Sequence, residues 1–227
     1  MRIISGIARG KKLFSPTTEA TQPTMDRAKE TLFNMLESWR LKEGKGWGQL
    51  SFLDVFAGSG SIGIEAWSRG VKCPYFMENE PEALKILNQN LALVKLPKAN
   101  PVDAVKPPLA PRAVSVAFMD APYGKGLWAA ALPKLIQAGW IDKETLIVVE
   151  TDKKAPEIVT DGFYEVKERA AGRNLFLFIK QGDTDETKLY KNGNGRTCFG
   201  GGYGRTSQIW SPRGSIGDGR YCHCFIC

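Results

Sequence analysis

The sequence carries the stretch Phe52-Leu-Asp-Val-Phe-Ala-Gly-Ser-Gly-Ser-Ile-Gly63, whose three parts predict three different structures. The apolar run at its start predicts a short buried strand. The glycines predict a sharp turn, because Gly58 and Gly60 have no Cβ to hinder a bend or the close approach of a ligand. Apolar residues then recur at helical spacing from Ile62. A strand, a glycine turn and a helix are typical of the opening of a nucleotide-binding α/β sheet.

Two cofactors fit this turn, and an ordinary βα turn without a ligand remains a third interpretation. Gly58, Gly60 and Gly63 satisfy the dinucleotide fingerprint of NAD. Glu78 follows at the distance expected of an acid that binds the ribose hydroxyls, but S-adenosyl-L-methionine has the same ribose. Asp54 favours S-adenosyl-L-methionine, because a carboxylate at the end of the strand can face a cationic ligand.

The composition predicts a globular protein with an anionic partner. Its 227 residues suffice for one substantial domain, and 43% hydrophobic residues are normal for a globular core. The net charge of +7 favours nucleic acid as the partner. No apolar run approaches the ~20 residues of a membrane helix, and no signal peptide is visible. We therefore expect a cytoplasmic monomer with no membrane partner.

The N-terminus is basic and rich in glycine. We expect two short strands, residues 2–4 and 11–14, which form a hairpin around the turn at residues 6–10. Such a hairpin can expose its basic side chains on one face, for contact with RNA or simply with solvent. The side chains that we expect to contact RNA there are Arg2, Arg9 and Lys11.

A helix is predicted after the polar loop at residues 17–24, with Thr24 as its N-cap. Its apolar stripe runs from Ala28 to Trp39. This start places Arg27 in the first turn, where free backbone N–H groups attract anions. Arg27 is therefore a predicted ligand for a phosphate or a carboxylate, with a solvated first turn as the alternative.

The rest of the main body alternates between strands and helices. Further strands are predicted at 73–78, 113–119 and 144–150, and residues 163–169 and 174–180 are predicted as a closing antiparallel pair. This order predicts an α/β sheet with an antiparallel edge strand and an N-terminal β-hairpin.

Acids recur where the predicted strands end. They are Asp54, Glu78, Asp103 and Asp120. Because ligands of such sheets bind beyond the carboxyl ends of the strands, we expect these acids to converge. Asp103 can accept a hydrogen bond from an adenine amino group. The predicted cofactor-binding residues are Asp54, Phe56, Gly58, Gly60, Glu78 and Asp103.

The segment Asp120-Ala-Pro-Tyr123 is the predicted catalytic motif. A planar amine needs two acceptors that direct its lone pair at a methyl donor, and the Asp120 carboxylate and the Ala121 carbonyl can supply them. Pro122 stiffens the turn. Tyr123 offers a ring on which a base can stack, worth ~1–3 kcal/mol. The amine becomes acidic once methylated, so water or Asp120 can take its proton.

Several stretches, in this order along the chain, resemble the signatures of one family. They are Met1-Arg-Ile-Ile-Ser-Gly6, Arg9-Gly-Lys-Lys-Leu13, Thr21-Gln-Pro-Thr-Met-Asp-Arg27 with Phe33-Asn34, Asp54-Val-Phe-Ala-Gly-Ser-Gly60, Glu65-Ala-Trp-Ser-Arg-Gly70 and Asp120-Ala-Pro-Tyr123. Over roughly residues 1–180 the chain resembles the RsmD family of 16S ribosomal RNA guanine-N2 methyltransferases. The last stretch resembles that family's Asp-Pro-Pro-Tyr motif.

The resemblance implies a class I methyltransferase that uses S-adenosyl-L-methionine. Its implied substrate is the exocyclic N2 amine of a guanine in small-subunit ribosomal RNA, either free or in an assembling subunit. There are two departures from the family pattern. Ala121 replaces the first proline of the motif, which loosens the loop but keeps the carbonyl. The residues beyond about 182 have no counterpart that resembles the family.

Other functions remain open on the sequence alone. Adenine N6 in DNA and glutamine in a protein are alternative amines, although no target-recognition domain is visible and glutamine enzymes usually have asparagine in place of Asp120. An inactive RNA-binding assembly factor is compatible with Ala121. An NAD-dependent oxidoreductase lacks a visible hydride-transfer acid after residue 80, and the single histidine, His223, lies near the C-terminus.

The expected domain organisation is a methyltransferase domain at residues 1–182, with the hairpin and first helix in residues 1–40. Residues 183–227 are rich in glycine and contain four of the five cysteines. We expect this tail to be flexible, because it lacks the periodicity needed to bury much surface. The spacing in Cys222-His-Cys224 and Cys227 is not a usual zinc pattern, so no metal is expected.

Overall fold

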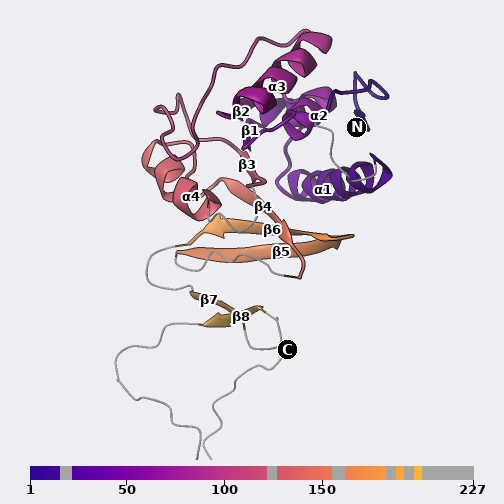
Figure 1. Ribbon diagram of the computed structural model, residues 1–227. Coiled ribbons are helices and arrows are strands. Elements are labelled where there is room, and N and C mark those ends of the chain that lie inside the picture. The colour runs from indigo at the N-terminus through magenta and orange to yellow at the C-terminus, as the bar shows by residue number, and fades with distance from the viewer. Residues whose placement is uncertain (16–21, 122–126, 155–161, 183–187, 192–196, 201–227) are drawn as a thin grey trace, which may run out of the picture.

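The computed structural model describes residues 1–15, 22–121, 127–154, 162–182, 188–191 and 197–200. Six strands form one sheet in the order β2-β1-β3-β4-β6-β5 (Figure 1). Strands β1 to β4 are mutually parallel, and β6 runs antiparallel to both β4 and β5. The strands are β1 Phe52–Val55, β2 Tyr75–Met77, β3 Val116–Met119, β4 Leu146–Asp152, β5 Phe163–Ala171 and β6 Asn174–Gln181. The predicted α/β sheet with its antiparallel edge is confirmed.

Helices cover both faces of this sheet. They are α1 Gln22–Lys42, α2 Ser61–Arg69, α3 Pro81–Leu93 and α4 Leu127–Gln137, with a short 3-10 helix, η1, at Trp47–Gln49. Side chains alternate along each strand, so Met119 packs toward α4 and Phe118 toward α1. Figure 1 shows α1 and α4 on opposite sides of the sheet. Helices α2 and α3 share a core cluster with the N-terminal residues Ile3 and Leu13.

Helix α1 begins earlier than predicted. Its first residue is Gln22, so Thr24 lies inside the helix and is not its N-cap. Pro23 is tolerated in the first turn, because the missing N–H of proline has no intrahelical acceptor there. Arg27 therefore belongs to the second turn, and the prediction that it lies beside the free N–H groups of the helix start is wrong.

The N-terminal segment, residues 1–14, is a hairpin in reduced form. One isolated bridge joins Arg2 and Lys12, and the Ile3 N–H donates to the Lys11 carbonyl at 3.0 Å. The segment lies against α2, where the buried Glu65 carboxylate accepts from the Ile4 and Ser5 N–H groups at 2.7 and 3.0 Å. These contacts give the basic segment a fixed position on the sheet's α1 face.

Part of the C-terminal region also forms regular structure. Strands β7 Lys188–Lys191 and β8 Thr197–Gly200 pair antiparallel in a sheet of their own, which the sequence did not predict. Residues 222–227, with their cysteines and histidine, lie outside the described residues. The domain boundary near residue 182 remains a prediction. Within the described ranges, none of the helices combines the length and apolar character needed to cross a membrane.

Candidate active site at the carboxyl ends of the strands

The glycine loop after β1 has two kinds of glycine. Gly58 and Gly60 have φ angles of 55° and 74°, in the left-handed region that glycine favours. A Cβ at Gly60 would overlap the Leu87 side chain, so that glycine serves packing. A Cβ at Gly58 would have only the Phe56 carbonyl oxygen nearby, at 4.0 Å. The face of Gly58 is therefore open for a ligand.

Glu78 ties the end of β2 to this loop. Its Oε2 accepts from the Gly58 N–H at 2.8 Å, and its Oε1 accepts from the Asn79 and Glu80 N–H groups at 2.9 and 2.8 Å. The half-buried carboxylate thus lies directly beside the open glycine, as the sequence predicted for an acid at the end of this strand.

Asp54 lies inside β1 and is buried beneath the loop. Its Oδ2 accepts from the Gly63 N–H at 2.8 Å, which fixes the first turn of α2. Burial raises the pKa of Asp54 well above its usual value, and repulsion by Asp120 and Glu78 adds to this effect, while the Gly63 hydrogen bond opposes it. Val55 pairs with Met77 on β2 and with Met119 on β3, so Glu78 and Asp120 lie on either side of the end of β1, close to Asp54.

Asp120 directly follows β3 and lies next to Glu150 on the neighbouring strand β4. Met119 pairs with Val149 in the register of β3 and β4, which places Asp120 beside Glu150. Asp120 is exposed to solvent, but the protein atoms around its carboxyl group reduce the hydration of that group. This desolvation raises the pKa of Asp120 to about 6. Burial raises the pKa of Glu150 well above its usual value, and the nearby Asp120 charge raises it further.

Glu150 was not among the predicted site residues. The Asn174 side chain on β6 donates to its Oε1, which orients the carboxyl group two residues before the end of β4. The same signal that selected Asp120, an acid that ends a buried apolar strand, could have found it. Glu150 is therefore the fourth carboxyl group of a cluster formed with Asp54, Glu78 and Asp120.

The other predicted residues of the site differ in their placement. Asp103 was predicted to end a short strand, and this prediction is wrong. It begins a turn in which its Oδ1 accepts from the Val105 N–H at 2.9 Å. The neighbouring Val102 N–H donates to the Glu78 carbonyl at 2.9 Å, so Asp103 still lies near the end of β2. Ala121 is buried directly after Asp120. Pro122 and Tyr123 lie outside the described residues.

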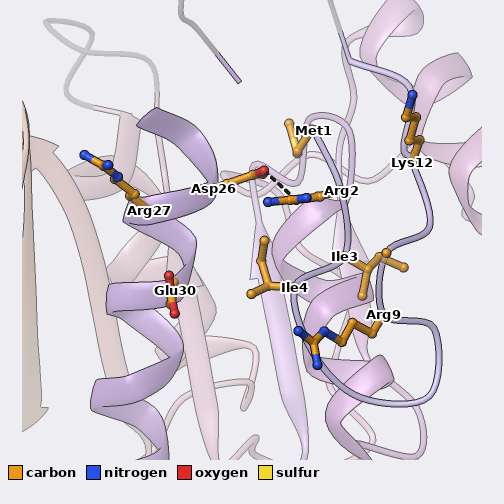
Figure 2. A pocket seen from close by; sticks show the side chains of 10 residues that line it. Met1, Arg2, Ile3, Ile4, Arg9, Lys12, Asp26, Arg27 and Glu30 are labelled. Carbon is orange, nitrogen blue, oxygen red and sulfur yellow. Dashed lines mark hydrogen bonds and ion pairs between the residues drawn. The ribbon is translucent and has the colours of Figure 1, made fainter. Parts of the chain in front are cut away.

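The predicted RNA-binding cations do not all share one surface. Arg2, Arg9 and Arg27 line a cavity between the N-terminal segment and α1 (Figure 2). The Lys11 ammonium instead donates to the Leu93 carbonyl at the end of α3, at 2.8 Å. Lys12 lines the cavity in its place. The alternation of side chains across the short hairpin decides this difference, which the pair of lysines in the sequence did not reveal.

Asn90 connects the N-terminal segment to the glycine loop. This fully buried side chain of α3 binds both backbone groups of Phe14, at 2.8 and 2.9 Å. Its amide also donates to the Ser59 carbonyl at 2.8 Å. This role could not be predicted from the sequence, because a single asparagine in a helix is usually exposed.

Comparisons with known proteins agree with this geometry. The family model described as "Conserved hypothetical protein 95" matches residues 1–180. The "Ribosomal RNA small subunit methyltransferase D" of Haemophilus influenzae is 35% identical over 179 residues, which are 76% of this chain and 89% of that protein. Its Escherichia coli K12 counterpart is 32% identical, over 82% of this chain and 93% of that protein. The chain belongs to the RsmD family.

A solved structure extends this likeness to the fold. The Escherichia coli protein titled "Putative methyltransferase yhhF" superposes with a TM-score of 0.64 at 28% identity, covering 80% of this chain and 98% of that one. The fold of this RsmD family member is therefore the Rossmann-like sheet of class I methyltransferases. Among the residues that the structure describes, no group of His, Cys, Asp and Glu side chains could hold a metal ion.

Proposed function

We propose that this protein is an enzyme that uses S-adenosyl-L-methionine to methylate the exocyclic N2 amine of a guanine in small-subunit ribosomal RNA. One observation carries the proposal: β1 and β3 are neighbouring parallel strands, so the open glycine loop and the Asp120–Ala121 motif follow them at the same end of the sheet. The relatives named as ribosomal RNA small subunit methyltransferases support the choice of substrate.

The residues present fit the cofactor. Gly58 leaves room for a ligand at the loop, and Glu78 lies beside it with a carboxylate that can accept from ribose hydroxyls. Glu78 and Asp120 follow the strands on either side of β1, so their carboxylates flank the glycine loop and favour a positive group there. S-adenosyl-L-methionine carries such positive charge, and it supplies an electrophilic methyl group when bound. NAD also carries a pyrophosphate, whose negative charges the same carboxylates would repel.

The chemistry of the chain's own residues is positioning. The Asp120 carboxylate and the Ala121 carbonyl accept hydrogen bonds from the two N–H groups of the target amine, which leaves the nitrogen lone pair free to face the methyl group. Asp120 is mostly ionised at neutral pH because its pKa is about 6. It can therefore accept a hydrogen bond from the amine and then take up the proton that the methylated nitrogen releases.

We expect the RNA to lie on the face of the sheet that α1 covers, next to the carboxyl ends of the strands. The N-terminal segment offers Arg2, Arg9 and Lys12 there, and the whole chain has a net charge of +7. Phosphate contacts of this kind position a nucleic acid without reading its sequence. An assembling small subunit, like free ribosomal RNA, presents such phosphates.

The substrate is tested by mass-spectrometric mapping of methylated guanines in ribosomal RNA from cells that lack this protein. We expect one small-subunit guanine to lose its N2 methyl group, and purified protein with S-adenosyl-L-methionine to restore it. An unchanged methylation pattern, or a lost methyl group on adenine, would overturn the proposal.

The role of Asp120 is tested with Asp120→Ala. We expect turnover to fall by about 10²–10⁴-fold, as for the loss of a positioned acid–base group. Isothermal titration calorimetry should show that the variant binds S-adenosylhomocysteine with nearly the wild-type affinity. NAD should bind more weakly than S-adenosylhomocysteine. Turnover at the wild-type rate would remove Asp120 from the mechanism.

A further inference from the structure

The cavity beside the N-terminal segment has the size and charge of a small-ligand site. Its volume is about 670 Å³, within the ~300–1,000 Å³ range of ligand pockets. Figure 2 shows it between the N-terminal segment and α1, with the Arg27 guanidinium extending away from Arg2. The charged residues that line it are Arg2, Arg9, Lys12, Asp26, Arg27 and Glu30. Four cations against two acids favour an anionic ligand.

Asp26 has an acceptor to spare. Its Oδ2 accepts from the Arg2 Nε at 3.1 Å, but its Oδ1 is buried and has no hydrogen-bond donor among the described residues. A buried acceptor without a partner is uncommon and calls for a donor, because its desolvation is otherwise uncompensated. The ligand that the cavity fits therefore carries an N–H or O–H group as well as negative charge.

The walls of the cavity are held rigidly. The buried Lys29 ammonium on α1 donates to the Arg2 carbonyl at 2.6 Å, and it pairs with Glu65 on α2 at 3.7 Å. The backbone bridge between Arg2 and Lys12 fixes the opposite wall. The backbone of the cavity walls is thus fixed before any ligand arrives, which lowers the entropic cost of binding.

The cavity also adjoins the candidate active site. Met1 lines it, and the Met1 Sδ lies 4.0 Å from the Ser59 Oγ in the glycine loop. A chain of nucleotides that enters the active site can therefore reach the cavity with a neighbouring residue. Bases are normally recognised in RNA when they are unstacked and hydrogen-bonded along their edges.

We propose that this cavity binds a second, unpaired ribonucleotide next to the target guanine, with a base N–H group on Asp26 Oδ1 and its phosphate on Lys12. This inference rests on the proposed function. It assigns Asp26 a role in reading the RNA, whereas Arg2 orients the Asp26 carboxylate through their ion pair.

The adjacent lysines provide a matched test of the phosphate contact. Lys11→Ala and Lys12→Ala remove the same charge from neighbouring exposed positions, but only Lys12 lines the cavity. We expect Lys12→Ala to raise the KM for small subunits purified from cells lacking the protein by about fivefold, with kcat retained, as for one lost phosphate contact. Lys11→Ala should change this KM by less than about twofold. Equal effects of the two variants would overturn the cavity and favour a diffuse basic surface.

The base contact is tested with Asp26→Asn and two RNA probes. A nine-nucleotide cytidine oligomer and an abasic oligomer of the same length present the same phosphates, but only the first has base N–H groups. We expect the wild-type protein to prefer the cytidine oligomer, and Asp26→Asn to reduce that preference by about tenfold, the loss of one charge-assisted hydrogen bond. An unchanged preference would overturn the role of Asp26.

The two proposals fail separately. If wild-type protein methylates small-subunit RNA while the lysine variants behave alike, only the cavity inference is lost. If no methyl transfer to RNA occurs but the cytidine preference depends on Asp26, the cavity stands as an RNA site and the proposed reaction falls. Thermal melts of each variant verify that its fold is intact.

Discussion

Asp120 has a carboxyl group whose ionisation is set by its neighbours and by the protein beneath it. Its pKa of about 6 lies close to the pH at which many enzymes work, whereas an ordinary aspartate has lost its proton by pH 5. Burial also raises the pKa values of Asp54 and Glu150 well above their usual values. Asp54, Asp120 and Glu150 therefore hold their protons to a higher pH than free acids would.

We predict that kcat/KM falls as the pH drops through about 6, because protonated Asp120 no longer accepts from the amine. Stability should change in the opposite direction. A carboxyl group with a raised pKa binds its proton more tightly in the folded state, so these groups increase the free energy of unfolding from pH 7 to pH 5. A pH–rate profile with parallel urea unfolding separates the two effects. The Glu150→Gln variant should show the same fall of kcat/KM at low pH. If that fall disappears in the variant, it belongs to Glu150 and not to Asp120.

We predict that two glycines of the same loop respond differently to alanine. Gly60→Ala places a Cβ against Leu87 at a φ of 74°, so it should destabilise the fold by about 1–3 kcal/mol. Gly58→Ala meets open space and should cost about 1–2 kcal/mol for its φ alone. Gly58→Ala should nevertheless weaken S-adenosylhomocysteine binding more, as calorimetry would measure. Equal binding by Gly58→Ala and wild type would show that no ligand approaches this face.

The elements of the fold follow from the sequence more closely than their connections do. Apolar runs and glycine turns were enough to predict the sheet, because buried parallel strands need continuous apolar residues. Asp54, Glu78 and Asp120 were likewise found from their positions at strand ends. The start of α1 at Gln22 was missed, because proline is compatible with a first turn as well as with a loop.

What sequence reasoning missed depends on contacts between distant segments. Lys11 and Lys12 are equivalent in composition, and only the bridge between Arg2 and Lys12 decides which one lines the cavity. The Asn90 contacts join α3 to residues more than 30 and 70 positions away. No local period or motif contains such information.

We predict that Asn90→Ala separates the N-terminal segment from the glycine loop. The variant should lose about 2–4 kcal/mol of unfolding free energy, since it leaves the backbone groups of Phe14 and Ser59 without their partner. It should also raise the Kd for S-adenosylhomocysteine, because Ser59 is no longer held.

Asn88→Ala on the same helix is the matched control. Among the described residues, Asn88 hydrogen-bonds only to the Ala99 backbone, at 3.1 and 2.8 Å, and not to the segment or the loop. It should lower stability without changing the Kd. Equal changes of Kd in both variants would contradict the connection through Asn90.

At the scale of the whole molecule, the N-terminal segment depends on a buried ion pair. The Lys29 and Glu65 side chains are 3% and 0% exposed, so both charges are almost fully removed from water. Burial lowers the pKa of Lys29, although Glu65 and Asp26 oppose this effect. Arg69 also pairs with Glu65 at 2.9 Å and shares its charge.

We predict that Lys29→Met destabilises the protein by about 3 kcal/mol, because Glu65 keeps its buried charge and loses one partner. Urea unfolding measures this loss. Arg2→Gln removes an ion pair whose arginine is 65% exposed and should cost less than about 1 kcal/mol. A loss as small for Lys29→Met as for Arg2→Gln would show that the buried pair does not anchor the segment.

The place of β6 in the chain order affects how the protein folds while it is being translated. Six residues of β4, Ile147 to Asp152, find their hydrogen-bonding partners in β6, which is synthesised after β5. At ~5–20 residues per second, translation needs a few seconds to pass from the end of β4 to the end of β6. Throughout that interval an apolar strand with an unpaired edge emerges from the ribosome, open to pairing with other nascent chains. Slower translation would lengthen this exposure of the β4 edge.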